Sequence, residues 1–130
     1  MALTDEVVRW FQGSSVWRVS DCVHWLHAIT GIPYRKSYWH RESTEALALH
    51  KAIRQFGSYR AAVEASLSLY GYFPVEESSP IIGDTDVVWV RDRLFGDLPA
   101  GLVPSGELMI RHPGGIAVVS GSILQVLRRY

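Results

Sequence analysis

The sequence predicts an α+β fold, with helices in the first half of the chain packed on one face of an antiparallel sheet formed by the second half. Up to about residue 70, apolar residues recur at helical spacing, and a glycine ends each of four expected helices. Beyond residue 86, short runs rich in valine and isoleucine alternate with glycine and proline, as is typical of strands. The length of 130 residues, 48% of them hydrophobic, suits a single domain spanning residues 1–130.

The first two expected helices have recognisable starts and stops. Thr4 can cap a short helix that closes at Gly13. Its apolar residues are Val7, Val8, Trp10 and Phe11. Asp21 is the expected N-cap of the second helix, which stops at Gly31. Its apolar residues follow the spacing i, i+3, i+4, i+7 and predict one buried stripe: Cys22, Trp25, Leu26 and Ile29.

Two further helices are expected before the sheet. One starts near Ser43, ends at Gly57, and is expected to bury Leu49, Ala52, Ile53 and Phe56. Ser58 then caps another, which ends before Gly71. One face of this last helix carries Tyr59, Ala62, Val63, Ser66, Leu67 and Tyr70.

The second half predicts four strands. Residues 87–90 are β-branched or aromatic and indicate a buried strand. Residues 91–106 contain three glycines and two prolines, so we expect a long loop there. Residues 107–111, 115–119 and 123–128 follow as three antiparallel strands. This order of helices and then a meander is what indicates the α+β class.

Composition excludes several kinds of protein. The 13 basic and 13 acidic residues balance, with no long run of one sign, so neither a nucleic acid nor a membrane surface is an expected partner. No stretch approaches the ~18 apolar residues of a membrane span. The N-terminus lacks the basic start and apolar stretch of a secretory signal, so we expect synthesis in a cytoplasm. A single cysteine rules out an internal disulfide framework.

Cys22 is the candidate nucleophile. It stands at the start of a helix, where unpaired N–H groups and the helix dipole lower the pKa of a thiol from about 8.5. The same groups can hold the oxyanion that forms when a thiolate attacks a carbonyl. Cys22 also lies on the apolar stripe, however, and a free cysteine is commonly a buried small hydrophobe. Both interpretations are open on spacing alone.

A thiol nucleophile needs a base, normally a histidine. His24 and His27 lie roughly 160° and 140° around the helix from Cys22, so they point elsewhere. His112, the only histidine of the strand half, ends a strand beside a tight turn, where it either serves as the base or simply begins a Pro-Gly turn. His24-x-x-His27 has no convincing third ligand, and phosphate and dinucleotide fingerprints are missing, so we expect no metal or cofactor.

Several segments resemble, in order along the chain, the NlpC/P60 family of papain-like cysteine peptidases. Residues 16–31 carry an aromatic stretch, the Asp21-Cys22 pair and a helix ending in Thr-Gly, like the nucleophile region of the small variants encoded in tail modules of phages and gene transfer agents. Residues 83–90 and 106–110 both resemble the Gly-Asp start of the family's first core strand. Shorter similarities are found at residues 34–38, 56–58 and 115–121.

The resemblance implies a papain-like fold and a set of site residues. Cys22 matches the nucleophile, and Gln125 is the best match for the third polar residue, on the following strand. The family's base stands at the beginning of the second core strand, which falls at about Gly115; His112 lies three residues earlier. Either a longer turn brings His112 into position, or the base is absent. Arg18 stands where active relatives usually have glycine.

Two functions are therefore expected from the resemblance. The first is a thiol-dependent hydrolase at a phage-like tail tip, cutting amide bonds of peptidoglycan stem peptides with Cys22, His112 and Gln125. The second is a structural adaptor of the tail-tip or baseplate complex that keeps the fold without turnover, with Tyr34, Tyr38, Trp39 and the 91–106 loop as its binding surface. Both place the protein in the virion tail tip, with other tail-tip or hub proteins as partners.

Overall fold

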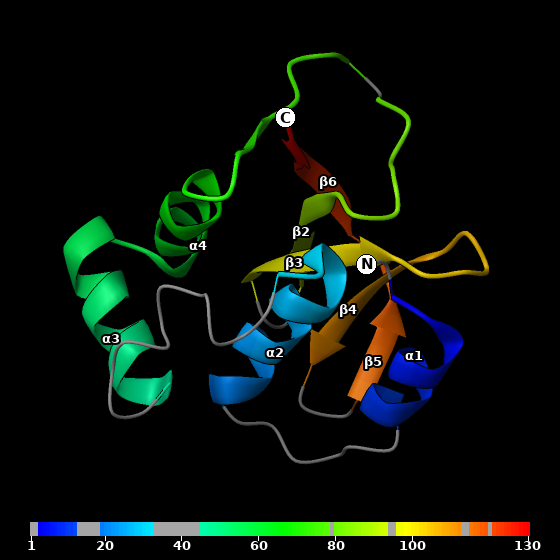
Figure 1. The fold of residues 1–130 in the computed structure, drawn as a ribbon, viewed down its shortest axis with the longest axis horizontal. Helices are drawn as coiled ribbons and strands as arrows, with labels where there is room; N and C mark the ends of the chain where they lie inside the picture. Colours follow the sequence, from blue (N-terminus) through cyan, green and yellow to red (C-terminus); the bar gives the residue numbers. More distant parts are fainter. Residues whose placement is uncertain are drawn as a thin grey trace.

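The computed structural model is an α+β fold of helices packed on an antiparallel sheet, as the sequence predicts (Figure 1). It describes residues 3–12, 19–32, 45–78, 80–93, 96–112, 115–119 and 121–130. Within them the helices are α1 (Asp5–Gln12), α2 (Val19–Thr30), α3 (Glu45–Phe56) and α4 (Tyr59–Ser68). The strands are β1 (Tyr72–Pro74), β2 (Val87–Asp92), β3 (Gly96–Leu102), β4 (Leu108–His112), β5 (Gly115–Val118) and β6 (Ser122–Arg129).

The helix ends follow local capping chemistry. The Ser58 hydroxyl accepts a hydrogen bond from the amide of Ala61 (3.0 Å), and Thr4 does the same for Val7 (3.3 Å), so both predicted caps are confirmed. Gly31, with φ of 73°, ends α2 as predicted. The predicted cap at Asp21 is wrong, because α2 begins at Val19 and Asp21 is its third residue.

The sheet has the strand order β1-β6-β2-β3-β4-β5, and every pairing is antiparallel. The expected run of three neighbouring strands at the C-terminus is wrong, because β6 pairs with β2 and β1 instead of β5. Only residues 119–121 join β5 to β6, and this link spans at most about 14 Å. In a flat sheet the two strands would lie about 19 Å apart, so the sheet must curl strongly.

Gly121 shows how tightly the curled sheet closes. A Cβ at this position would overlap the carbonyl oxygen of Arg91, on β2. The link between β5 and β6 therefore passes directly against the end of β2. Only glycine fits this approach of two backbones.

Strand β3 corrects the expectation of a long loop at residues 91–106. Its Pro99 pairs with Trp89 of β2 but lies beyond the β4 ladder, which starts at Ala100, so the missing N–H is tolerated there. A Cβ on Gly101 would lie 2.6 Å from Cγ1 of Ile29, in α2. Glycine therefore allows the helix to approach the sheet closely, and tertiary packing overrides the weak strand propensity of both residues.

Two apolar clusters lie on opposite faces of the sheet. The cluster between helices and sheet contains Phe11, Trp25, Ile29, Val63, Trp89 and Leu127 among others. The second cluster, inside the curl, contains Val75, Val88, Val90, Leu98, Ala100, Ile110 and Val126. One expected core residue is wrong, since Phe56 is 40% exposed. Leu49 and Ala52 have side chains outside the described set.

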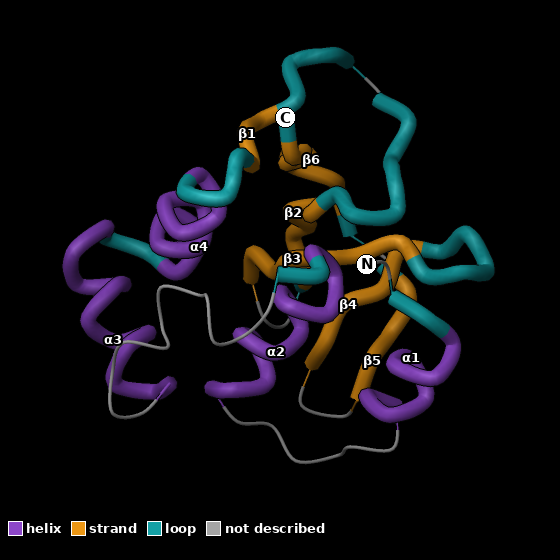
Figure 2. Tube along the Cα trace, viewed as in Figure 1, coloured by secondary structure: helices purple, strands orange, loops and turns teal. Residues whose placement is uncertain are grey.

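The connection from β1 to β2 is a long loop, residues 75–86, that leaves the sheet beside the C-terminus (Figure 2). Arg128 of β6 holds it through hydrogen bonds to Asp86 (2.8 Å from Nη2) and to the carbonyl of Ile81 (2.7 Å). The adjacent carboxylate of Asp86 raises the pKa of the Arg128 guanidinium. In the part of the chain that the structure describes, no helix has the length and apolar character needed to cross a membrane.

Candidate functional site

Helix α2 carries the predicted nucleophile and packs on the central strands. Its first turn contains the backbone of Cys22; the Cys22 side chain lies outside the described set. One turn later, the indole N–H of Trp25 donates to the carbonyl of Pro99 in β3 (2.9 Å). Another turn on, Ile29 packs against Gly101 of the same strand. The helix therefore runs alongside β3 in the same direction.

This register brings the start of α2 level with the start of β3. Three residues back along the helix from Trp25 is position 22, and two residues back along β3 from Pro99 is Asp97. These steps are about 4.5 Å and 6.6 Å, so the two backbones stay in step. Asp97 and Gly101 are four residues apart on the strand, so they lie on the same face, and Gly101 faces α2. Asp97, at the beginning of β3, therefore stands on the side of the sheet that the helices cover.

Asp97 is engaged by two arginines. Nε of Arg91, the neighbouring residue on β2, lies 3.2 Å from one carboxylate oxygen, and Nη1 of Arg60 on α4 lies 3.6 Å from the other. The Arg60 guanidinium also lies over the ring of Trp89, 5.6 Å from its centroid, and bonds Glu64 at 3.2 Å. This charged group bridges α4, β2 and β3. Sequence reasoning missed it because residues 91–106 were expected to be a loop.

The helical histidines have structural partners. Nδ1 of His27 donates to the carbonyl of Ile32 just past the end of α2 (2.7 Å). Burial lowers the pKa of His27, the Ile32 carbonyl opposes that shift, and His24 adds to it. His27 therefore helps to close the helix C-terminus, far along α2 from position 22.

His112, the predicted base, is the last residue of β4 and pairs through its backbone with Gly115. Its side chain lies outside the described set. Side chains of β4 alternate between the two faces: Met109 packs with the helix-side cluster, and Ile110 with the cluster inside the curl. Arg111 is buried, donates to the Gly115 carbonyl (2.7 Å) and faces Phe11 of α1. Near the end of β4, the side chain that faces the helices is therefore that of Arg111.

Gln125, the predicted third polar residue, lies on β6 and bonds toward β1. Its backbone pairs with Trp89 of β2, but its side-chain amide donates to the carbonyl of Val75, which follows β1 (2.9 Å). The sheet order puts β1 on the opposite side of β6 from β2 and β3. Gln125 therefore closes the end of the β1–β6 ladder, and the described contacts do not bring its amide to α2.

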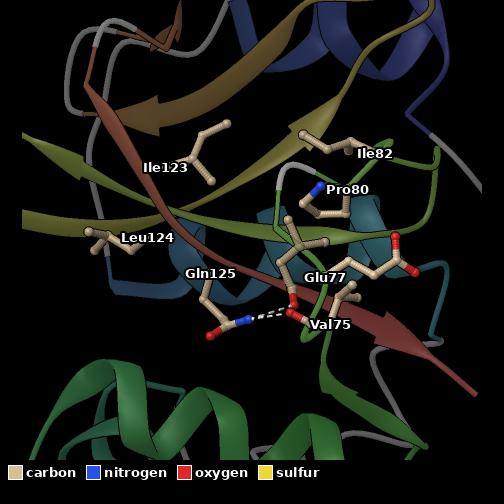
Figure 3. A pocket seen from close by; sticks show the side chains of 8 residues that line it. Val75, Glu77, Pro80, Ile82, Ile123, Leu124 and Gln125 are labelled. Atoms are coloured by element: carbon tan, nitrogen blue, oxygen red, sulfur yellow. Dashed lines mark hydrogen bonds between the residues drawn. The ribbon is translucent and has the colours of Figure 1, made fainter.

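A cavity of about 440 Å³ lies beside Gln125, within the range of about 300–1,000 Å³ usual for ligand pockets (Figure 3). We call it the β6 groove. It is lined by Val75, Glu77, Pro80, Ile82, Ile123, Leu124, Gln125 and Val126. In Figure 3, Ile123 stands on one side of it, and Pro80 and Ile82 stand on the other.

The described residues do not provide the loop that was expected as part of the adaptor's binding surface. Within the 91–106 segment, residues 91–92 belong to β2 and residues 96–102 form β3, so the described part is not a long surface loop. Tyr34, Tyr38 and Trp39 lie outside the described residues, as does Arg18.

Among the described residues, no group of three or more His, Cys, Asp or Glu side chains is arranged to hold a metal ion. Comparisons with protein-family models, with curated proteins and with solved structures return no match to this chain.

Proposed function

We propose that the protein is a structural adaptor of a phage-like tail-tip complex, built on a papain-like NlpC/P60 domain without a working catalytic pair. The observation that carries this proposal is the ion-paired Asp97, which bonds Arg60 and Arg91 at the start of β3, the strand beside α2. A thiol nucleophile needs a neighbouring group that accepts its proton. Asp97 supplies a carboxylate that is already committed to ion pairs with Arg60 and Arg91, and not the histidine that normally takes this proton.

The papain-like assignment within this proposal draws on the arrangement of α2 and the central strands. The first turn of α2 holds Cys22, and the helix packs on β3 through Trp25. Of the two segments that resemble the family's first core strand, residues 83–90 lead into β2, whose neighbour β3 comes next in the chain. The base position at the beginning of that second strand then falls at Gly96-Asp97, where no histidine stands.

A second candidate function, the thiol hydrolase, is favoured by the place of Cys22 itself. The first turn of a helix is where free N–H groups stabilise a thiolate and an oxyanion. In this mechanism Cys22 would attack the amide carbonyl of a stem peptide, and His112 would carry the proton to the leaving amine. Gln125 would have to exchange its bond to Val75 for one to the histidine.

Zymography on peptidoglycan separates the two functions. The wild type, Cys22→Ala and His112→Ala should all leave the gel uncleared if the adaptor proposal is right. Clearing by the wild type that is lost in Cys22→Ala would overturn it and establish the hydrolase. The positive test is assembly, because particles carrying Cys22→Ala should form tails in the same yield as the wild type. A deletion of the whole chain should abolish the yield, and normal tails without the chain would refute an adaptor role.

A further inference from the structure

The edge of β6 extends well past its outer neighbour. β1 pairs with residues 127–129, and the amide of Val75 then reaches the carbonyl of Val126 (2.8 Å). Beyond that bond, residues 122–125 of β6 have no described strand on this side. A strand edge of this kind offers main-chain donors and acceptors to another chain.

Leu124 is the residue of this edge whose backbone N–H and C=O we expect to be most accessible for pairing with another chain. Val126 and Tyr130 direct backbone groups toward β1. Groups on one edge of an antiparallel strand recur every second residue, which puts Leu124 next in line. β2 also skips Leu124, since its register shifts from the pair Trp89–Gln125 to the pair Val90–Ile123. The bulge thus leaves Leu124 without a register partner on β2.

The β6 groove lies along this edge. Four consecutive β6 residues line it, although alternate side chains of a strand point to opposite faces, so the cavity runs beside the strand. Of its apolar lining, Ile123 is 51% exposed, and Ile81, between the lining residues Pro80 and Ile82, is 91% exposed. An extended chain lying in the groove could pair with β6 and bury an apolar side chain against Ile82 and Pro80.

The charge of the opposite wall selects the partner. Residues 75–86 contain four acidic residues and no lysine or arginine. Asp86 is paired with Arg128. Glu77 also attracts Arg128, but its side chain is exposed and lines the groove, and Glu76 beside it is exposed as well. A carboxylate beside an apolar slot, on a loop that carries no basic residue, favours a partner with alternating apolar and basic residues.

We infer that the β6 groove binds an extended basic-apolar segment of another protein, which adds as a strand to the edge of β6 at residues 122–125. Main-chain hydrogen bonds would hold the segment, and the apolar slot and Glu77 would select its side chains. The site is on the opposite side of β6 from the strands that contact α2, and it does not depend on whether Cys22 is catalytic.

The test uses the full-length ¹⁵N-labelled chain and the blocked peptide acetyl-Lys-Val-Lys-Val-Lys-amide. We expect binding tighter than about 1 mM, about −4 kcal/mol, with shifts confined to the groove and slowed exchange of the Leu124 amide. The same peptide with glutamate in place of lysine should bind several-fold more weakly. A version N-methylated on alternate residues should lose binding, because it cannot form one side of the ladder.

Two protein variants complete the design. Glu77→Lys should reduce or invert the preference for the lysine peptide. The matched control Glu6→Lys lies on α1, far from the 75–86 loop in Figure 1, and should leave the preference unchanged. Equal binding of all three peptides would overturn the inference. So would shifts located outside the groove, or no shifts at all at about 1 mM peptide.

Discussion

Trp25 and Pro99, 74 residues apart in sequence, are joined by a buried hydrogen bond from the indole N–H to the proline carbonyl (2.9 Å). The donor is fully buried and also packs edge-on against Phe11, at 5.0 Å between ring centroids. The acceptor lies in the strand that the sequence predicts as loop. One side chain therefore ties α1, α2 and β3 together and fixes the register of α2 along β3.

Trp25→Phe is expected to destabilise the fold. The change removes the donor and leaves the Pro99 carbonyl buried without its partner, which costs about 1–3 kcal/mol. The smaller ring adds a cavity cost. Urea unfolding followed by circular dichroism measures the loss. Trp10→Phe, at a position 61% exposed, is the matched control and should change the free energy of unfolding by less than about 0.5 kcal/mol. Equal losses in the two variants would contradict the assigned role of Trp25.

Gly101→Ala is expected to force α2 away from β3. The new Cβ would lie 2.6 Å from Cγ1 of Ile29 and 2.9 Å from Cδ1 of Leu3, an overpacking that costs about 1–3 kcal/mol. In an Ile29→Ala background the same change should cost much less, because the clashing side chain is gone. A double-mutant cycle in urea measures this coupling. Gly83→Ala serves as control, since its Cβ would meet Asp86 at an ordinary 3.4 Å. If the effects of Gly101→Ala and Ile29→Ala on the free energy of unfolding are additive, the contact between residues 101 and 29 does not set how closely α2 approaches β3.

The predictable parts of this fold are those with local causes. Thr4 and Ser58 cap the helices that follow them because a hydroxyl reaches an amide three residues on. Gly31 can be recognised as a helix end for a similar reason. The stripe of α2 likewise follows from spacing, and its Trp25 and Ile29 are buried.

The unpredictable parts depend on contacts between distant segments. Pro99 and Gly101 oppose a strand by propensity, and only the neighbouring α2 and the edge of the β4 ladder make β3 possible. The pairing of β6 with β2 follows from the curl of the whole sheet, which no local pattern encodes. The candidate site shares this division: helical spacing places Cys22 on α2, whereas Asp97 becomes visible only once β3 lies beside that helix.

His27 is expected to make stability depend on pH. Burial lowers its pKa in the folded state below the unfolded value of 6.5, so the unfolded chain takes up the proton first. Its contribution to stability is therefore complete above pH 6.5 and is lost as the pH falls from there toward the lowered pKa. His27→Gln keeps a donor for the Ile32 carbonyl and should flatten this part of the profile of urea midpoint against pH. His50→Gln, on the exposed side of α3, should leave the slope as in the wild type. If the slope of the urea midpoint against pH is the same in His27→Gln as in the wild type, other groups cause the pH dependence.

Asp97→Asn tests the register between α2 and β3 and the reason for proposing an adaptor. A carboxylate next to a thiol opposes its ionisation, so removing the charge should speed alkylation of Cys22, the chain's single cysteine. The measurement is the rate of iodoacetamide labelling at fixed pH, followed by mass spectrometry on protein whose folding is checked by circular dichroism. Asp84→Asn, at an exposed position of the 75–86 loop, is the matched control and should label at the wild-type rate. If Asp97→Asn is labelled no faster than Asp84→Asn, the Asp97 carboxylate does not lie close enough to Cys22 to influence its thiol. A wild-type thiol that already labels fast in mild acid would point instead to an activated nucleophile, because only a thiolate reacts.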